Sequence, residues 1–223
     1  MGQIMEIEDY YGWSTHRPLL QTLVAVYKPQ FILELGVGVY STPIFIDYTP
    51  KELMCIENDE KWFNHMKSKF SGCNIILHKL DDSIDLDTFP KQLTKEQTNN
   101  ITNYYNNLCK QLQSNDSHLK MLFVDNFTCC RAIAINTLYK AFDIVAYHDC
   151  EPKGIDWYEY YFVDDLKKEF NSYMLKAPAS WAGVFIKHDL DQSKLYTTII
   201  PYINKYCGEN RLNNKQVYLE KEY

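Results

Sequence analysis

The chain has 223 residues, of which 46% are hydrophobic and 23% charged, and its formal net charge is −6. This composition is typical of a soluble globular protein, and the negative charge argues against a protein that binds by neutralising many phosphates, so we expect no nucleic-acid partner. No apolar run approaches the roughly 18 residues of a membrane span and the acidic N-terminus is unlike a signal peptide, which predicts a cytoplasmic protein without a membrane partner.

The first 29 residues contain an acidic arm over 1–11 and then the start of an apolar helix. Ser14 or Thr15 is the expected N-cap of this helix, because a short side-chain oxygen can accept a hydrogen bond from its first turn. Pro29 ends the helix just before the next element.

A short apolar run, Phe31–Leu35, predicts a buried strand. Gly36 and Gly38 then predict a tight loop, and a helix starts at Ser41. Without a Cβ, glycine allows such a loop to take positive φ and approach a ligand beside the unpaired N–H groups of the helix start. A dinucleotide-binding loop would have a third glycine at Ser41. Glu34 puts a carboxylate at the mouth of the strand, where it would repel a phosphate and attract an ammonium group.

The next run, Glu52–Glu57, predicts a second strand that ends in a carboxylate. Glu57 lies 21 residues after Gly36. An acid at that offset, at the carboxyl end of the neighbouring strand, can accept both ribose hydroxyls of an adenosine. A helix over 58–70 and a third strand over 74–80 are predicted to follow.

The pattern Glu-Leu-Gly-x-Gly-x-x-Ser-Thr from residue 34, with an acid in register at Glu57, resembles the cofactor motifs of class I S-adenosylmethionine-dependent methyltransferases. The resemblance implies S-adenosylmethionine as the cofactor and a doubly wound α/β fold, with a mostly parallel, seven-stranded Rossmann-like sheet and an antiparallel terminal pair. It departs at Tyr40, where many members have a third glycine. The cofactor-binding residues that it implies are Glu34, Gly36, Gly38, Ser41, Glu57 and, as acceptors for the adenine amino group, Asp81 and Asp82.

The rest of the chain continues the alternation of strands and helices. The predicted elements are a helix within 84–119, a strand over 120–126, a helix around 132–138, a strand over 143–150, a tyrosine-rich helix over 154–170, an antiparallel pair at 173–177 and 181–187, a helix over 195–206 and an edge strand at 216–219. We expect a single domain over 1–223, made of an N-terminal arm and helix (1–29), a core (30–187) and a C-terminal extension (188–223).

Two of these strands deliver acids to the sheet edge at which open α/β sheets bind ligands. Asp125 ends the fourth strand, and His148 and Asp149 end the fifth. We expect these three as the catalytic residues, with His148 as a general base near neutral pH. The alternative is that His148 is a structural hydrogen-bonding partner of the neighbouring aspartate.

In metal-dependent small-molecule O-methyltransferases, which this edge resembles, the positions of Asp125 and Asp149 hold a divalent cation. Those enzymes typically add an Asp or Asn directly after the second position, where this chain has Cys150. A thiol is a poor ligand for a hard cation such as Mg²⁺. The seven cysteines also lack paired metal-site spacing, which predicts reduced thiols. We therefore expect no metal, with Asp125 and Asp149 as the weak alternative pair.

Base-methylating enzymes have Asp/Asn-Pro-Pro-Tyr/Phe where this chain has Asp-Asn-Phe-Thr from residue 125, which argues against a base methylase. Residues available for an acceptor pocket are Trp13, His16, Tyr158, Tyr160 and Trp181. The leading hypothesis is O-methylation of a small-molecule acceptor with hydroxyl groups, such as a sugar or nucleotide-sugar, and a homo-oligomer stays open. A catalytically inactive S-adenosylmethionine-binding module and an NAD-linked oxidoreductase are the alternatives, of which Ser41 disfavours the second.

Overall fold

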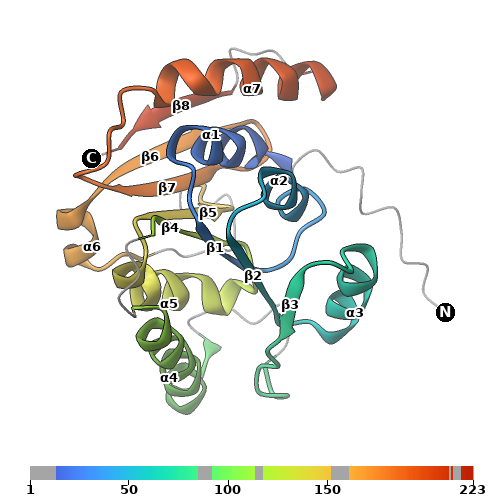
Figure 1. Cartoon of the computed structure of the whole chain (residues 1–223). Coiled ribbons are helices and arrows are strands. Elements are labelled where there is room, and N and C mark those ends of the chain that lie inside the picture. The colour runs from blue at the N-terminus through green and yellow to red at the C-terminus, as the bar shows by residue number, and fades with distance from the viewer. Residues whose placement is uncertain are drawn as a thin grey trace.

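The computed structural model describes residues 14–84, 92–113, 118–151, 161–210, 212 and 217–222. Within them, eight strands form one sheet in the order β3-β2-β1-β4-β5-β7-β6-β8 (Figure 1). The strands are β1 (Phe31–Leu35), β2 (Glu52–Glu57), β3 (Asn74–Leu77), β4 (Lys120–Val124), β5 (Ile144–His148), β6 (Phe170–Lys176), β7 (Ala182–Lys187) and β8 (Tyr218–Lys221). The helices are α1 (Arg17–Tyr27), α2 (Thr42–Tyr48), α3 (Glu60–Lys69), α4 (Lys95–Leu112), α5 (Thr128–Leu138), the short η4 (Tyr139–Ala141), α6 (Asp164–Glu169) and α7 (Leu195–Glu209).

The sheet is parallel over its first five strands and antiparallel at its other end. β1 pairs in parallel with β2 and β4, β2 with β3, and β4 with β5. β7 runs antiparallel between β5 and β6, and β8 adds antiparallel to β6. The predicted doubly wound, mostly parallel α/β fold with an antiparallel terminal pair is confirmed. The predicted number of seven strands is wrong, because the expected C-terminal edge strand joins the sheet as an eighth.

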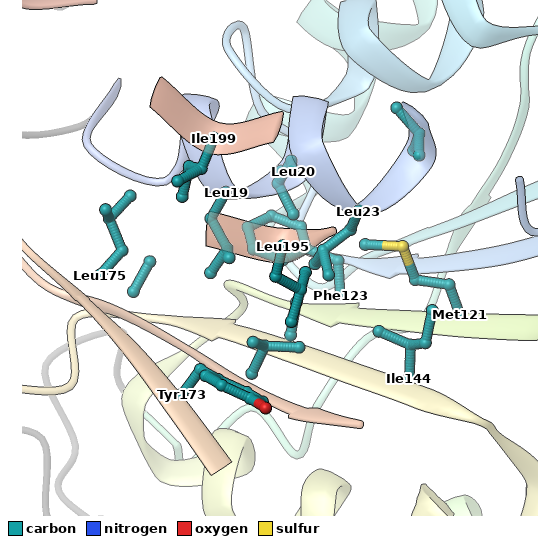
Figure 2. Close-up of a cluster of buried hydrophobic side chains, with 14 of the residues drawn as sticks. Leu19, Leu20, Leu23, Met121, Phe123, Ile144, Tyr173, Leu175, Leu195 and Ile199 are labelled. Carbon is teal, nitrogen blue, oxygen red and sulfur yellow. The ribbon is translucent and has the colours of Figure 1, made fainter. Parts of the chain in front are cut away.

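Helices cover both faces of the sheet (Figure 1), and β4 shows why its sequence is a continuous apolar run. Met121 and Phe123 pack into the cluster that contains the apolar side chains of α1 and α7 (Figure 2). Leu122 and Val124 pack into the opposite cluster, with residues of α4 and α5. A strand buried on both faces needs apolar side chains at every position, as is usual in parallel sheets.

The alternation of side chains decides which polar residues reach the α1 side of the sheet. Ile32 of β1 and Ala146 of β5 both belong to the cluster packed against α1. Since residues two apart on a strand share a face, Glu34 and His148 point to that same side. The hydrogen-bond partners agree, because Glu34 bonds to the start of α2 and His148 lies against Thr15, just before α1.

Several predicted element ends are wrong. His16, not Ser14 or Thr15, is the N-cap of α1, and it makes no side-chain capping bond. The third strand ends at Leu77 instead of residue 80. The arm over 1–11 and the first part, 154–160, of the predicted tyrosine-rich helix lie outside the described residues. Over the described rest of that range the prediction is wrong at both ends: α6 covers only Asp164–Glu169, since Val163 has extended backbone angles and Phe170 begins β6.

Other predictions hold within the described residues. The polar stretch before β4 contains the expected long helix, α4, which begins with a reciprocal capping box between Thr94 and Gln97. All seven cysteines are free thiols, as predicted. In the part of the chain that the structure describes, the helices are too short or too polar to serve as membrane spans.

Candidate functional site

The loop after β1 lies directly against the end of β4. Gly36 has a φ of +84°, and a Cβ on it would collide with the Asp125 carbonyl and lie 2.7 Å from the Asn126 nitrogen. A Cβ on Gly38 would lie 2.6 Å from the Ser41 hydroxyl oxygen. The sequence predicts these glycines as points of ligand approach. In the structure, contacts within the protein already require glycine at both positions. Gly36 has a left-handed backbone packed closely against β4, and the Ser41 side chain occupies the space that a Cβ on Gly38 would need.

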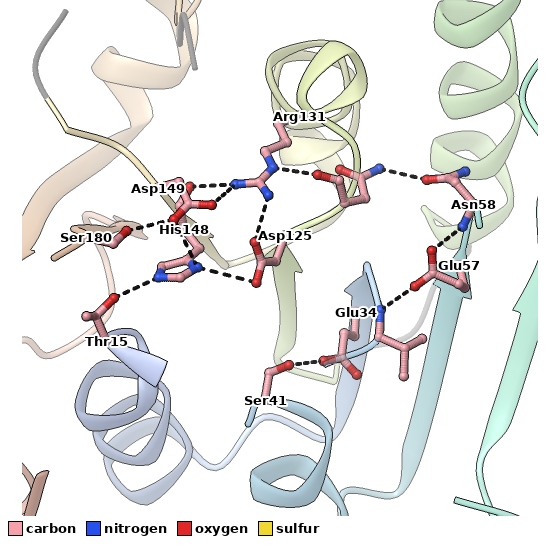
Figure 3. A network of polar contacts seen from close by, with 12 residues as sticks. Thr15, Glu34, Ser41, Glu57, Asn58, Asp125, Arg131, His148, Asp149 and Ser180 are labelled. Carbon is pink, nitrogen blue, oxygen red and sulfur yellow. Dashed lines mark hydrogen bonds and ion pairs between the residues drawn. The ribbon is translucent and has the colours of Figure 1, made fainter. Parts of the chain in front are cut away.

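Glu34 is completely buried beneath the first turn of α2. Its carboxyl oxygens accept hydrogen bonds from the hydroxyls of Ser41 (2.5 Å) and Thr42 (2.8 Å), as Figure 3 shows for Ser41. Burial raises the pKa of Glu34 to about 7, although these hydroxyl bonds oppose the rise. The structure therefore differs from the expected position at the mouth of the strand. Any effect of Glu34 on a ligand would pass through Ser41 and Thr42.

Glu57 ties the glycine loop to the end of β2. Its side chain is 4% exposed and accepts hydrogen bonds from the backbone N–H groups of Val37 (3.0 Å), Asn58 (2.7 Å) and Asp59 (3.0 Å). Burial raises the pKa of Glu57, and these three bonds oppose the shift. A carboxylate has about four lone-pair positions, so about one remains for a ligand. The sequence predicts contacts to two ribose hydroxyls, and this geometry leaves room for one.

The acids after β3 are both exposed. Asp81 accepts hydrogen bonds from the backbone N–H and the hydroxyl of Ser83, at 2.9 and 2.6 Å. These bonds hold the pKa of Asp81 below its usual value. Asp81 and Asp82 stay predictions as acceptors for an adenine amino group.

Arg131 of α5 connects the carboxylates that end β4 and β5 (Figure 3). Its guanidinium forms ion pairs with Asp125 (2.9 Å) and Asp149 (2.8 Å), and its side chain is 8% exposed. It also donates to the carbonyl oxygens of Asn126 (2.5 Å) and His148 (3.2 Å). Arg131 is not among the residues predicted from the sequence. The signal that could have indicated it is an arginine with apolar neighbours in a helix, six residues after a strand-end aspartate.

The three predicted catalytic residues lie together. Nδ1 of His148 is 3.4 Å from Asp125 and 3.5 Å from Asp149, and Nε2 is 2.8 Å from the Thr15 hydroxyl (Figure 3). Burial lowers the pKa of His148, but the two carboxylates raise it by more, so it lies above its ordinary value.

Asp149 is held by several groups at once. It has a φ of +52°, in the left-handed region that few residues other than glycine adopt. Ser180 donates a hydrogen bond of 2.7 Å to its carboxylate. Burial raises the pKa of Asp149, but His148 and Arg131 together lower it by more. The result is an ionised carboxylate with a fixed orientation.

Of the five residues proposed for an acceptor pocket, the structure describes His16 and Trp181. His16 is buried, with its ring edge-on to His148 at 4.4 Å between centroids. Burial holds the pKa of His16 well below its usual value, so the ring is neutral. Trp181 is partly buried, and its backbone N–H donates to Glu151. The positions of the other three predicted pocket residues, Trp13, Tyr158 and Tyr160, lie outside the described residues.

The weak alternative metal pair, Asp125 and Asp149, does not fit a divalent cation. The guanidinium of Arg131 bridges the two carboxylates and compensates one of their two negative charges. Cys150, at the position of the expected third ligand, has its thiol 3.0 Å from the Met174 sulfur, and burial raises its pKa well above the usual value. Asp125 and Asp149 are therefore bridged by a guanidinium, which argues against a cation shared by this pair.

Comparisons with known proteins give similarities of fold. Neither a protein-family model nor a curated protein matches the chain. Among solved structures, a methyltransferase-like protein from Silicibacter pomeroyi is similar at 15% identity and a TM-score of 0.45, covering 83% of this chain and 92% of its own. The plantazolicin methyltransferase BamL, solved in complex with a triazolic desmethylPZN analog and SAH, is similar at 10% identity and a TM-score of 0.49, covering 96% of this chain and 84% of its own.

An rRNA methylase from Streptococcus thermophilus is similar at 10% identity and a TM-score of 0.43, with 76% of this chain and 93% of its own covered. The descriptions of the three proteins name different substrates or none. The chain is thus similar in fold to proteins described as methyltransferases, and no acceptor follows from that similarity.

Proposed function

We propose that this protein is an S-adenosylmethionine-dependent methyltransferase that acts on an oxygen of a small hydroxylated acceptor, such as a sugar or nucleotide-sugar. The observation that carries the proposal is the hydrogen bond of 3.0 Å from the Val37 N–H to Glu57. It joins the glycine loop after β1 to the acid at the end of β2. Loop backbone and carboxylate then face one ligand region at the carboxyl edge of the sheet, where α/β proteins bind nucleosides.

The charge around the loop favours a sulfonium cofactor over a dinucleotide. α2 has only seven residues and starts above the carboxyl group of Glu34. A pyrophosphate at this helix start would lie beside that carboxyl group, and the Ser41 hydroxyl occupies the space next to Gly38. The amino-acid end of S-adenosylmethionine carries an ammonium beside its carboxylate, and its sulfonium is positive, so it brings less negative charge to this loop than a pyrophosphate does.

The cluster at the ends of β4 and β5 is the proposed acceptor site. Methyl transfer from a sulfonium has a good leaving group, so the protein must mainly position the acceptor and remove its proton. Asp125 and Asp149 have side chains 20% and 21% exposed, and they are proposed to hold an acceptor hydroxyl. When no metal ion is bound, His148 is proposed to accept the proton of the acceptor hydroxyl, because the carboxylates of Asp125 and Asp149 stabilise the charged form of the imidazole.

The proposal is tested first by ligand-dependent stability. Unfolding of the full chain is followed with S-adenosylhomocysteine and, in parallel, with NAD. A ligand at about 100 times its dissociation constant should raise the unfolding free energy by about 2.7 kcal/mol. Stabilisation by S-adenosylhomocysteine alone is expected. Stabilisation by NAD alone would support an oxidoreductase, and no effect of either would refute an adenosyl site.

A second test replaces the acid proposed to hold the ribose. Glu57→Gln should weaken S-adenosylhomocysteine binding roughly ten- to a hundredfold, since a hydrogen bond to a charged group contributes about 1.5–3 kcal/mol. Glu52→Gln makes the same chemical change at the exposed start of the same strand and should bind like the parent. Because Glu57 also holds Val37, the stability of each variant is measured without ligand. Unchanged affinity in a folded Glu57→Gln protein would contradict the proposed ribose contact.

A binding module without turnover is the second candidate, and one observation favours it. Arg131 already pairs with both proposed acceptor-holding carboxylates, and His148 is only 3% exposed. Release of S-adenosylhomocysteine in the presence of sugar and catechol panels separates an enzyme from such a module. If the protein turns over, Asp149→Asn should abolish turnover and leave cofactor affinity unchanged. Retained turnover would remove Asp149 from the chemistry.

A further inference from the structure

His16 is a buried histidine whose ring nitrogens have no partner among the described residues. It is 2% exposed, and both Nδ1 and Nε2 are without a hydrogen bond. Buried polar side chains nearly always have a hydrogen-bond or metal partner, so a neutral imidazole left in this state requires an explanation. Its ring lies between Phe123, at 5.2 Å between centroids, and His148, at 4.4 Å.

The fold places His16 close to the carboxylate of Asp125 and the imidazole of His148. One ligand atom from each of His16, Asp125 and His148 can be chosen so that all three lie within 4.8 Å of one another. Two ligands on a tetrahedral zinc ion, with bonds of about 2.0–2.1 Å, are about 3.3–3.4 Å apart, so closure of the trio around an ion needs movements on the order of 1 Å.

The contact between His148 and Asp125 already has this spacing. Nδ1 of His148 lies 3.4 Å from an Asp125 oxygen, longer than the about 2.7–3.2 Å of an ordinary hydrogen bond. Nε2 of His148 is 2.8 Å from the Thr15 hydroxyl. A metal-binding histidine usually directs its second nitrogen to such a partner, which fixes the ring while the first nitrogen binds the ion.

We propose that His16, Asp125 and His148 form a binding site for a divalent transition-metal ion such as Zn²⁺. Two imidazoles and one carboxylate suit Zn²⁺, Fe²⁺ or Co²⁺ and are poor donors for Mg²⁺ or Ca²⁺. The local charge suits a cation, because among the described residues the carboxylates of Asp125 and Asp149 share the one guanidinium of Arg131. The site uses the Asp125 oxygen that faces His148, and Arg131 keeps the other.

Three protein ligands leave an open coordination position, the arrangement found in catalytic rather than structural zinc sites. Asp125, with 20% of its side chain exposed, is the member of the trio through which a water or an acceptor could reach such an ion, since His16 and His148 are buried. A cation held there would lower the pKa of a bound water or hydroxyl, and His148 would then serve as a ligand instead of a proton acceptor. Metal binding itself does not depend on methyl transfer, so it can be tested separately.

The test is calorimetric titration of the chelator-treated full chain with Zn²⁺, Co²⁺ and Mg²⁺. One Zn²⁺ per chain is expected, with Mg²⁺ bound at least about a hundredfold more weakly. His16→Asn should weaken Zn²⁺ binding at least about a hundredfold, more than the loss of a supporting partner around a metal site. His65→Asn, at an exposed histidine of α3, is the matched control and should bind like the parent.

Absence of stoichiometric Zn²⁺ binding, equal affinity for Mg²⁺, or parent-like binding by a folded His16→Asn protein would each overturn the proposal. X-ray absorption at the zinc edge on the unmodified protein tests it without a variant. It should show imidazole scattering with no sulfur ligand. Sulfur in the first coordination shell would assign the ion to cysteines and also overturn the proposal.

Discussion

The buried carboxyl group of Glu34 makes the stability of the protein depend on pH. Burial raises its pKa from 4.5 to about 7 in the folded chain. Between these values the folded state holds a proton that the unfolded state has released. Stability from this group is therefore fully present below the unfolded pKa and falls as the pH rises toward 7. Glu34→Gln replaces the carboxyl group with a neutral one of the same size and should remove this dependence.

The size of the effect follows from the two pKa values. The difference between 4.5 and about 7 corresponds to about 3 kcal/mol of unfolding free energy. Urea denaturation at several values between about pH 4 and pH 8 measures it for the parent and the variant. The parent should lose about 3 kcal/mol more than Glu34→Gln across this range, and the difference between the two curves cancels the other titrating groups.

Glu52→Gln, the same change at an exposed position, serves as the control and should follow the parent curve. Parallel curves for the parent and Glu34→Gln would refute the reasoning, because Glu34 would then ionise as an ordinary glutamate. If the parent instead became more stable relative to the variant as the pH rises, the pKa of Glu34 would be lowered in the folded state and not raised.

Two further predictions concern close contacts. Arg131→Met removes the cation shared by Asp125 and Asp149. The unfolding free energy in urea denaturation should fall by about 3 kcal/mol, since each carboxylate loses its partner. A loss below about 1 kcal/mol would show that the ion pairs are dispensable for stability. Gly183→Ala puts a methyl group into the ring of Tyr147 on the neighbouring strand and should cost about 1–3 kcal/mol. Combining it with Tyr147→Leu should recover part of the loss in thermal unfolding, and no recovery would assign the cost to another contact.

The sequence predicts the fold well because its signals are local. The central strands are short, mostly apolar runs. An acid stands at the end of three of them: Glu57 is the last residue of β2, and Asp125 and Asp149 come directly after β4 and β5. Parallel strands bring their carboxyl ends to one edge, so the meeting of Asp125 with His148 and Asp149 follows from topology.

The partners of these residues come from distant parts of the chain and are not readable as a pattern. Thr15 lies 133 positions before His148, and His16 is an isolated histidine before a helix. In the sequence, Arg131 is one polar residue among apolar neighbours in a helix. Its ion pairs depend on how α5 is rotated against the sheet, which the sequence pattern does not give. The side to which Glu34 points was predictable in principle, because it alternates with Leu33 and Leu35 along β1.

The order of the strands has a consequence for the motions of the site. β1, β4 and β5 lie in the interior of the sheet with hydrogen-bonded neighbours on both sides, whereas β3 forms one margin. Amide protons should therefore exchange with solvent slowest in those central strands and faster in β3. The part of the sheet edge that carries Asp125 and His148 would then be the more rigid one, and the part next to Asp81 the more mobile one. A bound nucleoside would be expected to slow exchange mainly at that margin.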